Sequence, residues 1–288
     1  MDKAIRKLGE LPPFSPVLNR LLATLAAEDV SFAKLSDLIE KDTVVSGNLL
    51  HLVNSALYAR RGTINSVRHA VSILGMSKLR NAVLGMSIAR MWNQVRTPPS
   101  WSMARFNLHS VSTAVLCDLL AQRLPVSYPE GAFVAGLFHD VGRMLIALAL
   151  GEEHTRLVEM TKLAVRPVLD CERPVLDCER SVLGFTHPEL SAEALVFWKL
   201  PQQIQSAVRD HHDPPADPSS KPGEIPLSHV IDAANQYVNS QGVTILEGQA
   251  TEFADATMVT ALGLTPECLE NVLSEYQTES AAMAQFFK

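Results

Sequence analysis

The sequence predicts an all-α protein, a helical bundle built from two packed helical subdomains. Apolar residues recur at helical spacing along most of the 288 residues, and this spacing is the main signal of amphipathic helices. No segment shows the convincing alternation of apolar and polar residues that predicts a strand. The composition, 47% hydrophobic and 19% charged residues, is that of a globular protein that folds by burying its own core.

Four apolar runs predict helices in the first 75 residues. They span 17–25, 32–39, 44–53 and 67–74. Ser31 and Asp42 precede the second and third runs, where an N-cap side chain accepts hydrogen bonds from the first free backbone N–H groups. Gly75 follows the fourth run and predicts a stop, because glycine readily adopts the left-handed conformation that ends many helices.

Longer helices are expected in the rest of the chain. They are predicted at 78–94, 102–124, 130–150, 187–198, 201–211 and 225–238. Pro98-Pro99 separates the first two of these, and a proline pair is a strong local break. We therefore expect an N-terminal helical subdomain over 1–97, a second helical subdomain over 98–240 and a C-terminal helical extension over 241–288.

One heptad, Pro-Val-Leu-Asp-Cys-Glu-Arg, occurs twice in succession, at 167–173 and at 174–180. A seven-residue insertion advances a helix by almost two turns with a drift of about 20°, so it can lengthen a helix and keep its buried face aligned. It can equally lengthen a loop. Pro174 disfavours one uninterrupted helix, because an interior proline costs roughly 3 kcal/mol. We interpret the repeat as a tolerated duplication without a function of its own.

The remaining composition indicates a cytoplasmic protein. The four cysteines lack Cys-x-x-Cys spacing, so neither a structural zinc site nor a disulfide framework is expected. The N-terminus is charged and has no apolar core of a secretory signal. The most apolar stretch, 131–150, is interrupted by His139, Asp140 and Arg143, whereas a membrane span needs roughly 20 uncharged residues.

The charges are distributed unevenly along the chain. Residues 43–117 contain no Asp or Glu and carry a formal charge of +8, so the remainder carries −14. Such a segment can form a surface for an anionic partner. It can also pair with acidic helices of the same fold, and the sequence leaves both interpretations open. The residues proposed for an interaction surface are Arg60, Arg61, Arg68, Lys78 and Arg80.

An ordered series of histidines and aspartates is the strongest chemical signal. Imidazole and carboxylate groups are the ligands that Zn, Fe, Mn and Ni sites use. The series therefore predicts a centre for one or two divalent metal ions. Its members are His109, His139, Asp140, His187, His211, His212 and Asp232.

No other chemistry competes with this series. The sequence contains no glycine-rich phosphate loop and no Gly-x-Ser-x-Gly nucleophile elbow. The basic helical region around 78–90 is weak evidence for DNA binding without a fuller motif. The pI of about 5.8 also argues against a nucleic acid partner.

Several short motifs follow one another in a characteristic order. They are Leu11-Pro12-Pro13-Phe14, Ile39-Glu40-Lys41-Asp42, Leu49 to Ala56, Ile64-Asn65-Ser66 and Ala70 to Gly75. In this order they resemble the HDOD domain (HD-related output domain) of bacterial signalling proteins. His109-Ser110 and the stretch from Ala135 to Arg143 are similar to the part of that family that is related to HD phosphohydrolases. The resemblance covers about 11–239.

The resemblance implies a compact helical bundle whose second subdomain is HD-like. Such domains are usually the output half of a two-component or other sensory protein, and no enzymatic activity is common to them. The implied partner is a protein of a signalling pathway, such as a sensor kinase or a receiver domain. Many relatives carry a preceding receiver domain. Because the first motif begins within a dozen residues of Met1, we expect either a stand-alone domain or a fragment.

The resemblance also assigns roles within the histidine and aspartate series. HD phosphohydrolases hold a metal at positions that match His109, His139, Asp140 and Asp232. The HD-GYP proteins, which hydrolyse cyclic di-GMP, add a histidine before proline and a His-His doublet. His187 and the doublet His211-His212 are similar to these and imply a second metal site.

Two departures from the active pattern weigh against hydrolysis of cyclic di-GMP. The residues after the His-His doublet, 213–223, do not contain the Gly-Tyr-Pro signature. The lysine that closes the family motif is replaced by Arg143, which can still contact phosphate.

The sequence therefore favours a signalling output domain that acts through protein interaction and is not a catalyst. A metal-dependent phosphohydrolase of a nucleotide or cyclic dinucleotide is one alternative. A binding module for an anionic second messenger is another. The oligomeric state stays open.

Overall fold

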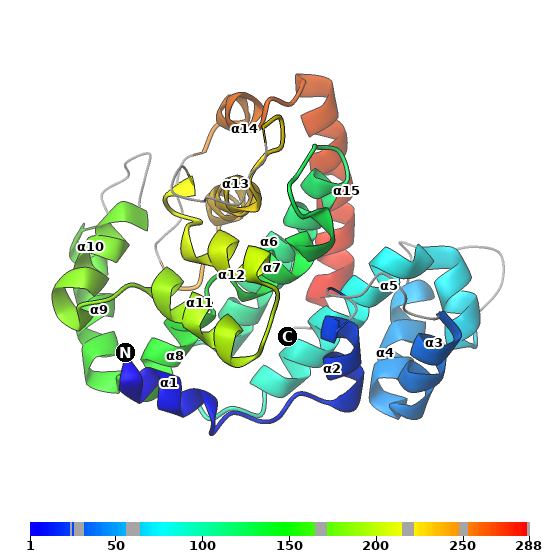
Figure 1. Cartoon of the computed structure of the whole chain (residues 1–288), viewed down its shortest axis with the longest axis horizontal. Helices are drawn as coiled ribbons and strands as arrows, with labels where there is room; N and C mark the ends of the chain where they lie inside the picture. Colours follow the sequence, from blue (N-terminus) through cyan, green and yellow to red (C-terminus); the bar gives the residue numbers. More distant parts are fainter. Residues whose placement is uncertain are drawn as a thin grey trace. The chain divides into compact units, whose positions relative to one another are not determined.

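The computed structural model describes residues 1–23, 25, 32–55, 64–164, 172–214, 222–247 and 253–286 (Figure 1). The described residues form helices and no strand, and their one β-type contact is an isolated parallel bridge between Val126 and Ile225. The prediction of an all-α protein is confirmed.

The chain divides into two compact units. The first unit comprises 1–11 and 96–276, and the second comprises 12–95 and 277–288. The predicted limit between 97 and 98 lies close to the observed limit between 95 and 96. The segment 241–288, expected as a separate extension, is divided between the two units.

The second unit is built from α2, α3, α4 and α5. Their bounds are Pro16–Ala23, Phe32–Lys41, Thr43–Val53 and Val67–Trp92. Asp42 caps α4, because its Oδ1 accepts hydrogen bonds from the backbone N–H groups of Val44 at 3.2 Å and Val45 at 3.1 Å. The predicted cap at Asp42 is therefore confirmed, whereas Ser31 lies outside the described residues.

Gly75 interrupts α5 as the sequence predicts. Its backbone has φ 76° and ψ 168°, which is not helical, so α5 consists of two helical segments joined at a kink. Only glycine adopts such a conformation without a steric penalty. A second helical segment begins immediately after the stop, and the whole element therefore runs on to Trp92.

The first unit contains most of the remaining helices. They are α1 (Asp2–Leu8), α6 (Met103–Ala121), the 3₁₀ helix η1 (Pro129–Gly131), α7 (Ala132–Phe138), α8 (Val141–Ala149), α9 (Gly151–Ala164), α10 (Glu172–Leu183), α11 (His187–Phe197), α12 (Gln202–Arg209), α13 (Leu227–Ser240) and α14 (Asp255–Leu262). The last helix, α15 (Pro266–Ala284), begins in the first unit and ends in the second.

Helix α7 lies at the core of the first unit, where α6, α12 and α13 pack around it (Figure 1). The contact with α6 is close: a Cβ added at Gly136 would lie 2.8 Å from the Cα of Ala114. The isolated bridge helps to place these helices. Ser127 N–H donates to the Ile225 carbonyl at 3.0 Å, which joins the chain entering α7 to the chain entering α13.

The predicted helix 130–150 is two helices, α7 and α8, that meet at His139 and Asp140. Asp140 has φ −105° and ψ 13°, outside the regular helical conformation. The break is invisible in the sequence because both sides of the junction are uniformly apolar. By length and composition the stretch Pro129–Ala149 could cross a membrane, but 94% of its most apolar window is buried, as in the core of a globular fold.

The second copy of the heptad lies in α10. Pro174 is the third residue of that helix, and a proline is tolerated in a first turn because the N–H groups there have no intrahelical acceptor. Residues 167–171 of the first copy lie outside the described residues. Near the end of the second copy, Glu179 is 4% exposed.

Candidate metal centre

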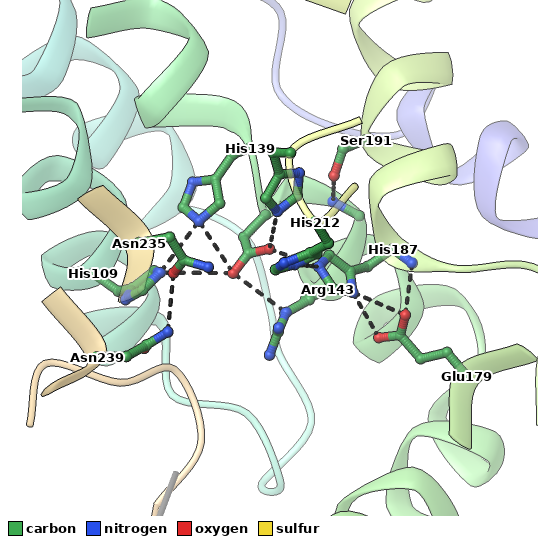
Figure 2. Close-up of polar contacts among 12 residues, drawn as sticks. His109, His139, Arg143, Glu179, His187, Ser191, His212, Asn235 and Asn239 are labelled. Atoms are coloured by element: carbon green, nitrogen blue, oxygen red, sulfur yellow. Dashed lines mark hydrogen bonds and ion pairs between the residues drawn. The ribbon is translucent and has the colours of Figure 1, made fainter. Parts of the chain in front are cut away.

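Four structural elements bring six of the seven predicted ligands together (Figure 2). His109 lies in the middle of α6, and His139 and Asp140 lie at the junction of α7 and α8. His187 is the first residue of α11, and the doublet His211-His212 follows the end of α12. All are buried except His212, which is partly exposed.

The first group of ligand atoms belongs to His109, His139 and Asp140. The two Nε2 atoms lie 3.3 Å apart, and they lie 3.6 Å and 3.4 Å from Asp140 Oδ2. An ion with tetrahedral ligands at about 2.0–2.1 Å separates its ligand atoms by roughly 3.3 Å. The three distances therefore fit a single ion of this size.

The second group belongs to Asp140, His187, His211 and His212, whose ligand atoms all lie within 4.8 Å of one another. His187 Nε2 is 3.0 Å from Asp140 Oδ1 and 3.1 Å from His212 Nε2. His211 Nε2 is 3.9 Å from the same Oδ1. Asp140 thus directs one carboxylate oxygen to each group, as a carboxylate that bridges two ions does.

Hydrogen bonds behind the rings fix three histidines in one tautomer. Nδ1 of each ring faces a backbone carbonyl, which can only accept, so Nδ1 carries the proton and Nε2 is left with its lone pair. The pairs are His109 with Val243 at 2.8 Å, His139 with Gly136 at 2.8 Å and His211 with Val208 at 2.7 Å. When both rings are neutral, the Nε2 lone pairs of His109 and His139 face each other across 3.3 Å, and a cation between them would be bound by both.

Two buried acceptor atoms of the predicted ligands have no hydrogen-bond partner among the described residues. They are Asp140 Oδ1 and His211 Nε2. His187 Nε2 lies 3.0 Å from Asp140 Oδ1 and forms an ion pair with it when the ring is protonated. Buried polar atoms are almost always satisfied, so these two acceptors, 3.9 Å apart, are suited to hold a cation between them. The donor set and its geometry therefore fit divalent metal ions.

Burial keeps three of the rings neutral. It lowers the pKa of His109 to about 4, and the neighbouring His139 lowers it further. Burial also moves the pKa values of His211 and His212 well below the usual range, and neighbouring histidines act in the same direction. Neutral imidazole is the form that binds a metal.

His187 and Asp140 behave differently. Burial disfavours the charged His187, but the carboxylates of Glu179 and Asp140 outweigh it and raise the His187 pKa to about 9. Burial likewise opposes the charged Asp140, yet Arg143, His139 and His187 hold the Asp140 pKa well below its usual range. Asp140 is therefore an anion at neutral pH.

Arg143, the predicted phosphate contact, lies inside the centre. Its Nε is 3.3 Å from Asp140 Oδ2, and the side chain is 6% exposed. Arg143 and Glu179 also line a small, largely apolar cavity of about 30 Å³ together with Trp101. That volume holds one or two water molecules and is far too small for a nucleotide.

Asp232, the seventh predicted ligand, does not join the others. It lies on α13, and its Oδ1 accepts a hydrogen bond from Gln236 at 2.8 Å. Asn235, three residues later, is fully buried and lies beside His109 (Figure 2). Its Oδ1 accepts a hydrogen bond from Asn239 at 3.0 Å. Three residues turn a helix by 300°, which leaves the two side chains 60° apart, so α13 directs an amide to the centre where we expected a carboxylate.

Sequence reasoning missed Asn235 and Glu179. A search for acidic and imidazole ligands passes over an amide, although Asn235 occurs at helical spacing from the buried Ile231 and Val238. Glu179 accepts hydrogen bonds from His187 but belongs to a repeat that shows no chemical signal.

The residues proposed for an interaction surface are largely in ion pairs or undescribed. Arg60 and Arg61 lie outside the described residues. Arg68 pairs with Asp37 at 2.9 Å, Lys78 pairs with Glu279, and Arg80 lies on α5. Two further basic residues of this segment are also paired, Arg90 with Asp42 at 3.3 Å and Arg105 with Glu247 at 4.0 Å. These pairs favour the interpretation that the basic segment is neutralised within its own fold.

Comparisons with known proteins agree with this architecture. The model of the HDOD domain family matches residues 11–214. An HDOD domain protein of unknown function from Geobacter sulfurreducens has 22% identity, with a TM-score of 0.74 over 99% of this chain and 96% of that chain. A candidate phosphohydrolase from Shewanella amazonensis has 21% identity, with a TM-score of 0.74 over 99% of this chain and 98% of that chain.

Two relatives are longer than this chain. An uncharacterized protein from Treponema pallidum is 23% identical over 245 residues, which cover 81% of this chain and 43% of that protein. A candidate signal transduction protein from Marinobacter aquaeolei is 22% identical with a TM-score of 0.70, over 96% of this chain and 60% of that chain. At these identities the solved structures support the fold alone.

Proposed function

This chain belongs to the HDOD family, and we propose that it is a signal-transduction domain that acts through a protein partner and not by catalysis. We further propose that its buried centre binds one or two divalent ions, with Fe, Mn, Zn and Ni as candidates. The observation that carries the proposed metal centre is that the ligand atoms of five histidines converge on the carboxylate of Asp140. When bound, divalent ions would supply Lewis acidity and positive charge.

Burial of the ligands supports a structural or regulatory centre. The ligands come from α6, the α7–α8 junction, α11 and the segment after α12, so an ion would join four elements of the first unit. Only His212 is partly exposed, and the cavity beside the centre holds about 30 Å³. The cavity that Arg143 and Glu179 line is too small for a nucleotide.

Substrate screening of the metal-reconstituted chain tests this proposal. Nucleotides and cyclic dinucleotides are incubated with the wild type and with Asp140→Ala, and phosphate or linear products are measured. We expect metal in the wild type only and no turnover in either protein. Turnover of roughly 1 per second or faster in the wild type, lost in Asp140→Ala, would overturn the non-catalytic proposal.

A metal-dependent phosphohydrolase is the second candidate. The specific observation in its favour is that two groups of ligands share Asp140, which is the arrangement of two-metal hydrolases. On this reading Arg143, 3.3 Å from Asp140, would exchange the carboxylate for a substrate phosphate. Such an enzyme would lose turnover in Arg143→Ala and retain its metal, and the screening experiment extends to this variant.

A further inference from the structure

Glu179 makes three short contacts with one residue of the centre. Its Oε2 accepts a hydrogen bond from the backbone N–H of His187 at 2.7 Å. The same carboxylate lies 2.8 Å and 3.0 Å from His187 Nδ1 through Oε2 and Oε1 (Figure 2). A single buried side chain therefore holds both the backbone and the ring of His187.

The backbone contact places the ring. His187 is the first residue of α11, and the first N–H groups of a helix have no partner within it. Glu179 satisfies this donor and binds the ring of the same residue, so the ring cannot turn without breaking two contacts of the carboxylate. Its Nε2 is thereby directed at Asp140 Oδ1, 3.0 Å away.

The group that accepts a hydrogen bond from Nδ1 of His187 also differs in charge from the groups that accept from Nδ1 of the other buried histidines of the centre. His109, His139 and His211 each bond to a neutral backbone carbonyl, whereas His187 bonds to a carboxylate. A carboxylate behind a ligating imidazole fixes its tautomer and makes it a stronger metal ligand, and loss of such a partner typically weakens metal affinity 10–100-fold.

We infer that Glu179, contributed by the second copy of the heptad, is a positioning residue of the metal centre that orients His187 and strengthens it as a ligand. The inference rests on the proposed metal centre and gives a role to a segment that the sequence left without one. Arg180, the next residue, pairs with Glu189 of α11 at 2.9 Å and 3.0 Å, so α10 is joined to the start of α11 at two adjacent positions.

Glu189 offers a matched control for Glu179. It also contributes a carboxylate at the start of α11, where it accepts a hydrogen bond from Thr186 N–H at 2.9 Å and pairs with Arg180. Its contacts do not include a histidine ring in the described part of the chain. Glu189→Ala therefore removes a helix cap and an ion pair, which are structural contributions, and leaves the ligands unchanged.

The experiment is a Co²⁺ titration of the wild type, Glu179→Gln, Glu179→Ala and Glu189→Ala, followed by visible absorption. We expect Glu179→Ala to bind one of the ions 10–100-fold more weakly than the wild type. Glu179→Gln can still accept from the ring but lacks the charge, so its affinity should lie between the two. Glu189→Ala should bind Co²⁺ as the wild type does, although it unfolds at a lower temperature.

A second readout needs no metal. Long-range ¹H–¹⁵N spectra of the metal-free protein report which ring nitrogens carry protons. Because the pKa of His187 is about 9, the spectra are recorded above that pH, where the ring is neutral. There we expect a proton on His187 Nδ1 in the wild type and in Glu179→Gln, and a mixture of tautomers in Glu179→Ala. The spectra also show whether each variant is folded, which separates loss of positioning from loss of structure.

Two results would overturn the inference alone: wild-type Co²⁺ affinity in Glu179→Ala, or an equal loss of affinity in Glu189→Ala. In both cases the wild type would still bind Co²⁺, and the proposed metal centre would stand. A folded wild type that binds no Co²⁺ would overturn the metal centre and the positioning role together.

Discussion

The His/Asp centre of the first unit and the part of the basic segment that lies in the second unit, 43–95, differ in how their charged groups are placed. In the centre, Asp140 and His211 are buried, and one acceptor atom of each has no hydrogen-bond partner in the described part of the chain. In the basic segment, Arg68 pairs with Asp37, and the two side chains are 64% and 51% exposed. Buried polar atoms without a hydrogen-bond partner indicate a bound ligand. Exposed charges that pair with each other are solvated and need no ligand.

The largest effect on stability is expected from a substitution that removes the negative charge of the centre. Asp140→Asn removes the only carboxylate that faces both Arg143 and the Nε2 of His187 among the described residues. Because an uncompensated buried charge is costly, we expect the metal-free variant to lose about 3 kcal/mol of unfolding free energy. Urea denaturation in the presence of a chelator measures this. A loss below about 0.5 kcal/mol, which is typical of surface substitutions, would contradict the proposal that Asp140 neutralises the buried positive charges of the centre.

Two glycines provide the next comparison. A Cβ at Gly142 would lie 2.2 Å from the His187 carbonyl oxygen, so Gly142→Ala must push α8 away from the start of α11. We expect a loss of about 1–3 kcal/mol and weaker metal binding.

Gly47, inside α4, is the matched control. A Cβ there meets nothing within 4 Å, so Gly47→Ala should stabilise the protein by about 0.5–1 kcal/mol through helix propensity. Thermal unfolding and metal titration of both variants check the pair. If the two substitutions had the same sign, the close contact between α8 and α11 would not be as described.

A carboxylate in place of Asn235 should strengthen metal binding at the His/Asp centre. Asn235→Asp places a charged ligand beside His109, and we expect about tenfold tighter binding of a divalent ion because ligand charge sets affinity. The metal-free variant should be less stable, since a second buried carboxylate then lies close to Asp140. Calorimetric titration measures the affinity. Asp232→Asn is the control, and a change of affinity there as large as at Asn235 would contradict the placement of α13.

The smallest effect is expected in the basic segment. Arg68→Ala removes an exposed ion pair, and such pairs contribute little to stability. We expect an unfolding midpoint that is indistinguishable from the wild type at high salt, and no change in bound metal. A marked loss of stability that persists at high salt would show that the segment is not simply a solvated surface.

The sequence predicts the fold class and much of the site because both depend on local patterns. Apolar spacing predicts the helices, and the N-cap at Asp42 and the interruption at Gly75 follow from the chemistry of single residues. The order of histidines and aspartates identifies Asp140 and the five histidines that meet at it. These signals can be read from the sequence because each depends on residues that are neighbours in the chain or on the order of the histidines and aspartates.

The remaining features depend on packing. The junction at His139 and Asp140 interrupts an apolar stretch that has helical character on both sides, so no local signal marks it. Asn235 faces the centre because of the rotation of α13, and Glu179 meets His187 because α10 lies against the start of α11. Such side chains are assigned only when the helices are placed in space.

The metal content of the purified chain tests the central claim most directly. The protein is reconstituted with Mn²⁺, Fe²⁺, Ni²⁺ or Zn²⁺, freed of excess ion and analysed for bound metal. The converging ligands predict about one to two ions per folded chain with at least one of these metals. Less than about 0.1 ion per folded chain with every one of them would contradict the assignment of the His/Asp cluster as a metal centre.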